Sequence, residues 1–463
     1  MTYKDNAVKD LKICYIGGGS RGWAWAFMAD LANDNQICGE VALYDIDHKA
    51  AMHNAQIGNS ISALDGASAK WRYEAKESLS EALTGADFVV ISILPGTFDE
   101  MQSDVHLPER HGIYQPVGDT AGPGGIIRAL RTIPMFVEIA EAIKAHAPNA
   151  WVVNYTNPMS ICIKTLYHVF PNIKAFGCCH EVFGTQKMLA SILKRELDIV
   201  AKRDEIKVNV FGINHFTWLD YASYKGIDLM PIYKAFVERN FDEGINEKDE
   251  NWLNSSFASQ NRIKFDLFRR YGYIAAAGDR HLAEFVNSDL YLKDRETVNH
   301  WKFGLTTVEW RKKDLAARVE KSRRLISGEL APSLEPSGEE GVLLIKALCG
   351  LGVMISNVNI PNHALQVANV DKHAIVETNA LFERDAIRPI SAGHMPEAVL
   401  ELTRPHLENH ELTLRAALTC DKSLVVQAFE NDPLLGGKLN KGEVAQLVDD
   451  MISNTKGYLP AGW

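Results

Sequence analysis

The sequence predicts an α/β protein with a doubly wound parallel sheet in its N-terminal part and a second, mostly helical α/β domain in its C-terminal part. Three observations predict this class: a glycine-rich turn directly after the first apolar segment, a second strand that ends in an acidic residue, and later strands that are continuous apolar runs. The chain has 463 residues, more than the roughly 250–300 at which one hydrophobic core stops growing. We therefore expect two packed domains, residues 9–207 and 208–463. In the second, helices are expected at Trp252 to Tyr271 and at Glu309 to Leu325.

Charge and composition exclude several classes of protein. The chain has 49 Lys+Arg against 59 Asp+Glu, a net charge of -10, which argues against binding to nucleic acid because that needs a basic surface. Seven cysteines and a polar start, Met1 to Asp10, without an apolar leader predict reduced thiols and a cytoplasmic location. The longest apolar run, Gly341 to Ile355, is interrupted by Lys346 and is shorter than the roughly 18–20 residues of a membrane span. We expect a buried core helix there and no membrane association.

The first strand, predicted at Lys12 to Ile16, is followed at once by glycines with the spacing G-x-G-x-x-G. In this spacing the glycines allow a tight turn, a close approach of the backbone to a pyrophosphate, and close packing of a helix whose N-terminus faces the anion. The second strand, Val41 to Asp45, ends in an acid 23 residues after Gly22, where an acid suits the ribose hydroxyls of NAD. This pattern indicates a Rossmann-type domain that binds NAD. The residues assigned to the cofactor are Gly17, Gly19, Ser20, Arg21, Gly22 and Asp45.

Polar and thiol side chains follow three further predicted strands, which begin at Trp151, Ile173 and Lys207. Ligands of doubly wound sheets bind outside the carboxyl ends of the strands, where these side chains are expected. A thiolate, imidazoles and amide oxygens gathered there are suitable ligands for a divalent transition metal. The residues in question are Asn154, Asn157, Cys179, His180, Asn214 and His215.

The same segments have purely structural explanations, which stay open at this point. An Asn-Pro pair such as Asn157-Pro158 is a common turn at the start of a helix. Cys178, Cys179 and His180 can be buried thiols and a core histidine. The glycine cluster from Gly118 to Gly125 opens a helix and is either a hinge or a backbone platform for a ligand; its position favours the platform.

Taken in order, these segments resemble glycoside hydrolase family 4, the NAD- and metal-dependent glycosidases. The likeness runs nearly the whole length of the chain. It implies a Rossmann-type NAD domain followed by a C-terminal α/β domain of the lactate/malate dehydrogenase-like kind. The matching segments are Gly17 to Gly22, Asp45, Gly118 to Pro134, Asn154 to Pro158, Cys179 to Val182, Gly212 to Phe216, Leu412-Thr413, Ala416 to Thr419 and Asp432-Pro433.

The resemblance implies hydrolysis by a redox route. In this family NAD takes a hydride from C3 of the sugar, a base removes the acidified C2 proton, and the glycosidic bond breaks by elimination before water and the hydride add back. A metal on the C2 and C3 oxygens, usually Mn(II), assists this chemistry. By the family's pattern Cys179 and His215 hold the metal, and Asn154, Asn157 and His180 bind the substrate.

The family pattern leaves the proton-abstracting base open, because many members use a tyrosine and one branch of α-glycosidases uses an aspartate in a Gly-Asp segment. Gly278-Asp279 is similar to that segment, and a carboxylate can serve because the metal makes the C2 proton acidic. We therefore expect Asp279 to be the catalytic base, with Tyr271 and Tyr273 as alternatives. A capping role at the start of a helix is the structural explanation for Asp279.

Two small motifs concern the substrate. Ser92 to Gly96, after the third strand, contains no Arg or Lys, whereas members acting on 6-phosphorylated sugars carry a basic residue there. Cys179-His180-Glu181-Val182 resembles the variant of the α-galacturonidase branch. We therefore expect a cytoplasmic, NAD- and Mn(II)-dependent α-galacturonidase that acts on short oligogalacturonides in pectin degradation and forms a dimer or tetramer. The alternatives are an α-glucosidase or α-galactosidase on neutral sugars, and a lactate/malate-type dehydrogenase.

A uronate substrate also needs a basic partner for its carboxylate. Arg128, Arg131 and Arg280 are candidates, and the sequence does not decide among them. Glu181 would repel such a carboxylate unless its side chain faces away.

Overall fold

The computed structural model describes residues 1–246 and 259–463. Its central parallel strands are β2 (Ala7–Ile16), β3 (Ile37–Tyr44), β4 (Trp71–Ala75), β5 (Phe88–Ile91), β6 (Trp151–Asn154) and β7 (Lys174–Gly177). They lie in the order β4-β3-β2-β5-β6-β7 and all run parallel. This is a doubly wound sheet, in which the order of the strands reverses between β2 and β5. The predicted α/β class is confirmed. Ligands of such sheets bind at this reversal, next to the end of β2.

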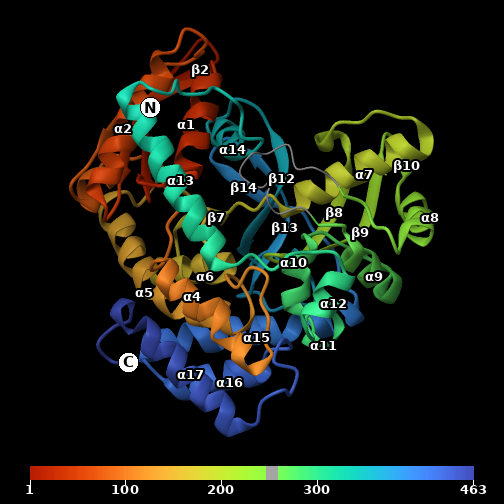
Figure 1. The fold of residues 1–463 in the computed structure, drawn as a ribbon. Helices are drawn as coiled ribbons and strands as arrows, with labels where there is room; N and C mark the ends of the chain where they lie inside the picture. Colours follow the sequence, from red (N-terminus) through yellow and green to blue (C-terminus); the bar gives the residue numbers. More distant parts are fainter. Residues whose placement is uncertain (247–258) are drawn as a thin grey trace.

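Helices cover both faces of the sheet (Figure 1). Along β2 the side chains alternate: Ile13 and Tyr15 belong to the core on one face, whereas Cys14 and Ile16 belong to the core on the other. Both faces are therefore buried, which explains the continuous apolar runs in the sequence. The helices are α1 (Trp23–Asn33), α2 (His48–Ala63) and α14 (Gly341–Leu348) on the first face, and α3 (Leu79–Leu83), α5 (Gly122–His146) and α6 (Met159–Val169) on the second.

Antiparallel strands from late in the chain extend the sheet beyond β7. They are β12 (Met354–Pro361), β13 (Ile375–Glu383) and β14 (Ala386–Pro389). β12 joins β7 where Asn359 pairs with Gly177. The prediction of one core helix over Gly341 to Ile355 is therefore wrong in its second half, which leads into β12. Gly350 and Gly352 have φ values of +80° and +136°, which L side chains rarely adopt, so the helix ends before them.

A smaller antiparallel sheet and several helices form the rest of the described chain. Residues 247–258 lie outside the described residues, and they include the beginning of the helix predicted at Trp252 to Tyr271. The described part of that prediction contains α9. The three last helices pack against α5 in the same core. These elements are β8 (Lys207–Ile213), β9 (Phe216–Tyr224), β10 (Ile227–Asp228), β11 (Ile274–Ala275), α7 (Glu181–Leu197), α8 (Met230–Asn240), α9 (Arg262–Tyr271), α10 (Asp279–Leu282), α11 (Ser288–Tyr291), α12 (Arg295–His300), α15 (Glu397–Thr419), α16 (Lys422–Asn431) and α17 (Lys441–Thr455).

A long charged helix, α13 (Val308–Ser327), runs diagonally across the front of the molecule in Figure 1. It confirms the helix predicted at Glu309 to Leu325. It packs against α2 and against α4 (Phe98–His106). Its first turn lies near the centre of the molecule, beside the carboxyl end of the sheet, and its last turn lies over the N-terminal part.

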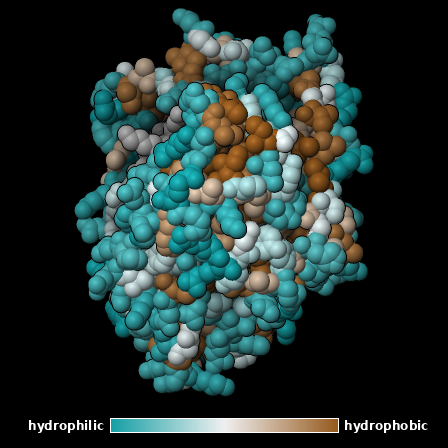
Figure 2. Space-filling view, turned by 90° about the vertical axis from the view of Figure 1, so that its right-hand side faces the viewer, coloured by the Kyte–Doolittle hydropathy of each residue, from teal (hydrophilic) through white to brown (hydrophobic). Residues whose placement is uncertain are grey.

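Hydropathy describes both the helices and the surface of the described residues. Across residues 1–246 and 259–463 no helix combines the length and the hydropathy that a crossing requires. Figure 2 shows hydrophobic side chains gathered over the upper part of one face of the molecule. Exposed large apolar side chains near α14 and β12 include Leu343, Val353 and Ile355, which are 47%, 65% and 59% exposed.

Candidate active site

The glycine-rich turn between β2 and α1 leaves no room for side chains at its first glycines. Gly17 has a φ of +91°, and a Cβ atom there would lie 2.0 Å from the carbonyl oxygen of Ser92. A Cβ atom on Gly19 would lie 2.9 Å from Oδ2 of Asp45. The N-terminus of α1 follows, with backbone N–H groups that are available to an anion. The turn thus fits the pyrophosphate of a dinucleotide.

Asp45, directly after β3, holds this turn in place. Its Oδ2 accepts a hydrogen bond from the backbone N–H of Gly19 at 2.8 Å, and its Oδ1 accepts one from Asp47 at 2.9 Å. Burial raises the pKa of Asp45, and the two N–H donors act against that rise. Ser20 closes the turn by donating its N–H to Gly17 at 3.0 Å. Arg21 lies beside it, with its guanidinium 3.9 Å from the carboxylate of Asp47.

A group of three metal-ligating side chains lies at the carboxyl end of the same sheet. Asp119, His215 and His281 each offer one ligand atom, and these atoms all lie within 4.8 Å of one another. The two imidazole rings are 3.8 Å apart, centre to centre. Asp119 precedes α5, His215 follows β8, and His281 lies on α10. The chain thus brings together three residues that are far apart in sequence.

Neighbouring polar groups fix the orientation of these three side chains. Oγ1 of Thr120 lies 2.9 Å from Nδ1 of His215, and Nδ2 of Asn157 donates to Oδ2 of Asp119 at 3.3 Å. Oε1 of Glu181 lies 3.7 Å from Nε2 of His281, while Oε2 of Glu181 accepts the backbone N–H of Gly278 at 2.6 Å. Outer partners of this kind usually orient the ligands of a metal.

The charges within the group suit a cation. Burial, and then the neighbouring His281, lower the pKa of His215 to about 3. Burial also lowers the pKa of His281. Burial alone would raise the pKa of Asp119, but His281, Arg128 and His215 outweigh it and hold that pKa well below its usual range. At neutral pH the group therefore presents two neutral imidazoles and a carboxylate, which is a donor set suited to a divalent transition metal.

Cys179 lies near this group without being part of it. Its ligand atom does not fall within the 4.8 Å set formed by the other three. Its carbonyl oxygen accepts a hydrogen bond from Nδ2 of Asn357 at 3.1 Å. Burial, followed by the charges of Glu377 and Glu181, raises the pKa of the Cys179 thiol well above its usual value. Of the two predicted metal ligands, the structure places His215 within the metal-capable group and Cys179 beside it.

The predicted substrate residues differ in their surroundings. Asn157 contacts Asp119, and its Oδ1 is buried with no hydrogen-bond partner among the described residues. Asn154 is fully buried and exchanges two hydrogen bonds with the backbone of Thr156, at 3.0 and 3.1 Å. Nδ1 of His180 lies 3.6 Å from Oε1 of Glu339. Asn157 is thus the amide whose free oxygen is available to a ligand.

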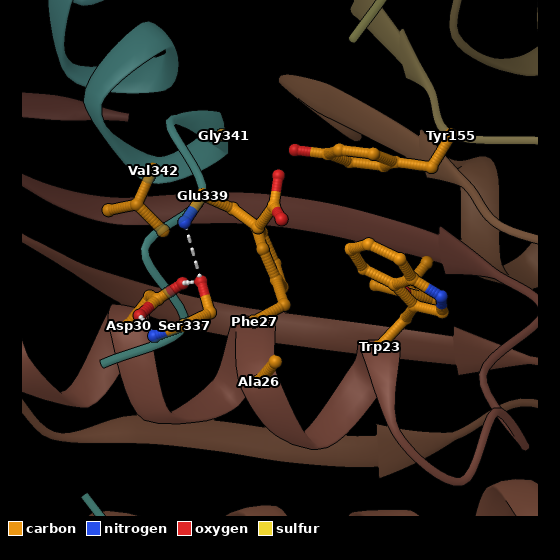
Figure 3. Close-up of a pocket in the computed structure, with 10 residues that line it drawn as sticks. Trp23, Ala26, Phe27, Asp30, Tyr155, Ser337, Glu339, Gly341 and Val342 are labelled. Atoms are coloured by element: carbon orange, nitrogen blue, oxygen red, sulfur yellow. Dashed lines mark hydrogen bonds between the residues drawn. The ribbon is translucent and has the colours of Figure 1, made fainter. Parts of the chain in front are cut away.

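Figure 3 shows a hollow lined in part by Trp23, whose ring lies 6.0 Å from the imidazole of His180, centre to centre. The rings of Trp23 and Tyr155 stack there at 6.1 Å, and the Tyr155 hydroxyl points toward Glu339. The loop that carries Glu339 is held on α1, because the backbone N–H of Ser337 donates to Asp30 at 2.8 Å. The hollow lies between α1 and this loop. The three metal-ligating side chains do not line this hollow, so the hollow is separate from the metal-capable group.

Within the described residues, the side-chain hydrogen bonds and ring contacts of the three predicted base candidates lead to residues outside the metal-capable group. Oδ1 of Asp279 accepts the backbone N–H of Lys264, in the first turn of α9, at 3.1 Å, so this carboxylate does not cap α10, the helix that it begins. Its Oδ2 has no hydrogen-bond partner among residues 1–246 and 259–463. Burial raises the pKa of Asp279 to about 6. Tyr271 packs edge-on against Trp218 at 5.9 Å. Tyr273 packs against Phe211 at 6.4 Å.

Glu284 supports the loop that presents Asp119. It is 1% exposed, and its Oε1 accepts backbone N–H groups from Val117 at 2.6 Å and Gly118 at 3.0 Å. Burial raises the pKa of Glu284 to about 8, although these donors act against the rise. The carboxyl group of Glu284 therefore binds its proton more tightly in the folded protein than in the unfolded chain.

The thermal stability of the protein should therefore depend on Glu284 as the pH changes. A raised pKa gives stability that is fully present below the unfolded pKa of about 4.3 and is lost as the pH rises toward 8. Glu284→Gln cannot ionise, so its Tm should fall less than that of the parent protein between pH 5 and pH 9. Thermal unfolding at both pH values measures this, with the exposed Glu335→Gln as control. Equal falls in all three proteins would contradict it.

Sequence reasoning missed Asp119, His281 and Glu284 as site residues. Asp119 lies inside the glycine cluster that was expected to form a ligand platform, and His281 comes two residues after the predicted base. These two neighbourhoods were the only hints that the sequence offered. The three residues come together through tertiary packing, which local sequence patterns do not reveal.

Fold and site together define a doubly wound α/β protein with a turn suited to a dinucleotide and a histidine–aspartate group suited to a metal. The model of family 4 glycosyl hydrolases matches residues 12–195, and the model of that family's C-terminal domain matches residues 210–435. The chain belongs to glycosyl hydrolase family 4.

Individual proteins give the same result. An α-galacturonidase from Lachnoclostridium phytofermentans is 66% identical over 464 residues, which span 100% of both chains. The crystal structure of lplD from Bacillus subtilis is 51% identical, covers 96% of this chain and 100% of its own, and has a TM-score of 0.90. A 6-phospho-α-glucosidase from gut microorganisms, solved in complex with NAD and Mn2+, is 18% identical, covers 97% and 99%, and has a TM-score of 0.79. The last of these shows the shared fold only.

Proposed function

We propose that this family 4 enzyme is an α-galacturonidase that uses NAD and Mn(II). The observation that carries the proposal is the 66% identity, over the full length of both chains, with an α-galacturonidase. The segment Cys179 to Val182 and the absence of a basic residue in Ser92 to Gly96 agree with it. Short α-linked oligogalacturonides are the proposed substrates.

The cofactors fit the residues that are present. The glycine turn accommodates a pyrophosphate, and the polar group of Asp119, His215 and His281 suits a divalent metal. When bound, NAD accepts and returns a hydride, and Mn(II) stabilises negative charge on the sugar oxygens. We propose that His215 holds the metal together with Cys179, and that Asp119 and His281 complete or support the set. A coordinated thiol loses its proton, which offsets the raised pKa of Cys179.

Two carboxylates in different environments suit different roles. The pKa of Asp119 is held low, so it stays ionised beside the metal, whereas the pKa of Asp279 is raised to about 6. A group with a pKa near neutral is the better general base. We therefore retain Asp279 as the proposed base for the C2 proton, with Tyr271 and Tyr273 as alternatives. Asn154, Asn157 and His180 are the proposed substrate-binding residues.

Asp45→Ala should weaken NAD binding about 10- to 100-fold, because hydrogen bonds to a charged group contribute about 1.5–3 kcal/mol. The substitution removes both the proposed ribose contact and the bond to Gly19. Titration calorimetry with NAD measures the effect, and the exposed Asp65→Ala serves as control. An unchanged NAD affinity would take Asp45 out of the cofactor site.

Pectin degradation in the cytoplasm and assembly into a dimer or tetramer are further parts of the proposal. The exposed apolar residues Leu343, Val353 and Ile355 support an assembly, because monomers rarely expose large apolar patches. Sedimentation analysis of the full chain tests it.

The experiment for the function compares an aryl α-galacturonide with the matching α-glucoside and α-galactoside. Each is assayed with NAD and Mn(II), and again with a chelator. We expect turnover of the galacturonide alone, and its loss with the chelator. Turnover of a neutral sugar would keep the family mechanism and overturn the substrate, whereas net NADH production from a hydroxy acid without metal would indicate a dehydrogenase.

A further inference from the structure

The first turn of α13 is anchored next to the loop that carries Asp119. The backbone N–H of Val308 donates to Nε2 of His106 at 3.2 Å. The backbone N–H of Thr306 donates to the carbonyl oxygen of Pro116 at 3.3 Å. Val308 is fully buried. Arg311, three residues later, lies on the same face of the helix as Val308, which is the face toward the protein.

Among the described residues Arg311 forms no ion pair, whereas the next two cations of α13 do. Lys312 pairs with Asp99 at 2.6 Å, and Lys313 pairs with Glu309 at 2.7 Å. The Nε atom of Arg311 is buried and has no hydrogen-bond partner within the described residues. A buried N–H donor without an acceptor is costly, and Nε is one of the five N–H donors that an arginine carries in a fixed plane. Its surroundings are therefore suited to an acceptor that arrives from outside the chain.

The other arginines around Asp119 have fixed positions. Nε of Arg128 donates to the carbonyl oxygen of Asn157 at 3.0 Å. Arg280 donates to the carbonyl oxygens of Pro116 at 2.7 Å and Gly304 at 3.2 Å. Carbonyl groups satisfy donors without cancelling their charge. The charge of Asp119 acts on both Arg128 and Arg311.

Arg131 can be removed from the candidates for substrate binding. It is fully buried and holds Asp104 through two hydrogen bonds of 3.0 and 2.6 Å, with a third to Thr455 at 2.8 Å. Its guanidinium is thus occupied by a pair that closes the core. A guanidinium engaged in two parallel hydrogen bonds to a carboxylate is not available to a ligand.

We propose that Arg311 binds the carboxylate group of the galacturonate and so sets the preference for a uronate over a neutral sugar. The proposal rests on the proposed α-galacturonidase function and names the residue that recognises the acid. A planar guanidinium can donate two parallel hydrogen bonds to a carboxylate. The hydroxymethyl group of a neutral sugar cannot accept both of these bonds.

A phosphate of NAD is the other anion that could meet this arginine. Arg318, further along α13, is the arginine that lies at the glycine turn, because its guanidinium donates to the carbonyl oxygen of Arg21 at 3.1 Å. Seven residues of helix, roughly 10 Å, separate the two arginines. Arg311 lies at the end of α13 that is anchored on Pro116, in the loop that carries Asp119, and this position favours the substrate.

The test measures kcat/KM for an aryl α-galacturonide, its methyl ester and the matching α-galactoside, in the parent protein and in Arg311→Gln, Arg311→Lys and Lys312→Gln. Lys312→Gln is the matched control, because it removes one positive charge from the same turn on the exposed side. Arg311→Gln should lose at least about 30-fold on the acid, as expected when one member of a buried ion pair is removed. It should lose little on the ester and the galactoside, and Arg311→Lys should recover part of the activity. NAD affinity should stay unchanged.

Each other outcome has a distinct meaning. Equal kcat/KM on the acid in the parent protein and Arg311→Gln would overturn the proposal, and so would a loss of NAD affinity, which would assign the anion to the cofactor. If Arg311→Gln does not fold, Arg311→Lys and the parent protein's discrimination between acid and ester still decide. A parent protein that cleaves neutral sugars and not the acid would instead refute the proposed function.

Discussion

Replacing His215 with alanine is expected to abolish Mn(II) retention and to lower kcat by at least about 10³-fold, because a bound metal contributes several kcal/mol to charge stabilisation. His215 is the residue on which two lines of reasoning agree. It follows β8 at the position predicted for a metal ligand, and it lies in the metal-capable group with Asp119 and His281. NAD binding should persist, since the glycine turn is untouched.

Metal content after gel filtration and turnover of the aryl galacturonide check this prediction. The exposed His146→Ala, at the end of α5, is the control for loss of an imidazole. Normal metal content in His215→Ala would refute its role. Cys179→Ser and His281→Ala, measured in parallel, test the other proposed ligands. Loss of metal in Cys179→Ser supports the pair predicted from the sequence, Cys179 and His215. Loss of metal in His281→Ala supports the group seen in the structure.

Asp279→Asn is expected to lower kcat by about 10²–10⁴-fold, which is the usual contribution of general acid–base catalysis. The asparagine keeps Oδ1, and with it the hydrogen bond from Lys264, so the fold should survive. Metal and NAD retention should be unchanged, whereas exchange of the C2 proton of a bound substrate with solvent should stop.

Exchange followed by NMR in deuterated water is the decisive measurement. Asp119→Asn is the comparison, because that carboxylate lies beside the metal-capable histidines and its loss should reduce metal retention. Full exchange in Asp279→Asn would move the base to Tyr271 or Tyr273. A loss of metal in Asp279→Asn would instead place this carboxylate among the groups that support the metal.

The sequence predicted those parts of the molecule whose signals are local. The turn from Gly17 to Gly22 and the acid at Asp45 depend on neighbours within one strand–turn–helix unit, so spacing alone identifies them. The strands beyond β7 were missed because the run from Gly341 to Ile355 has the same apolar character in its helix and in the approach to its strand. Only the glycines at 350 and 352 mark the change.

The site was harder to predict than the fold because it is assembled from distant segments. Asp119, His215 and His281 lie together although 96 residues separate the first two and 66 separate the last two along the chain. Hydrophobic periodicity does not predict such long-range contacts. Asn154 stays a predicted substrate residue, and its hydrogen bonds with the backbone of Thr156 show that position along the chain does not reveal the partners of a side chain.

The pairing of β12 with β7 has a consequence for the newborn chain. Gly177 leads directly to the predicted metal cysteine, yet its partner Asn359 leaves the ribosome roughly 10 to 40 seconds later, at about 5–20 residues per second. Until then β7 presents an open edge, which can pair with other chains. A chaperone that shields nascent chains would therefore matter most between the synthesis of these two strands, and a message cut short before β12 would yield a product prone to aggregation.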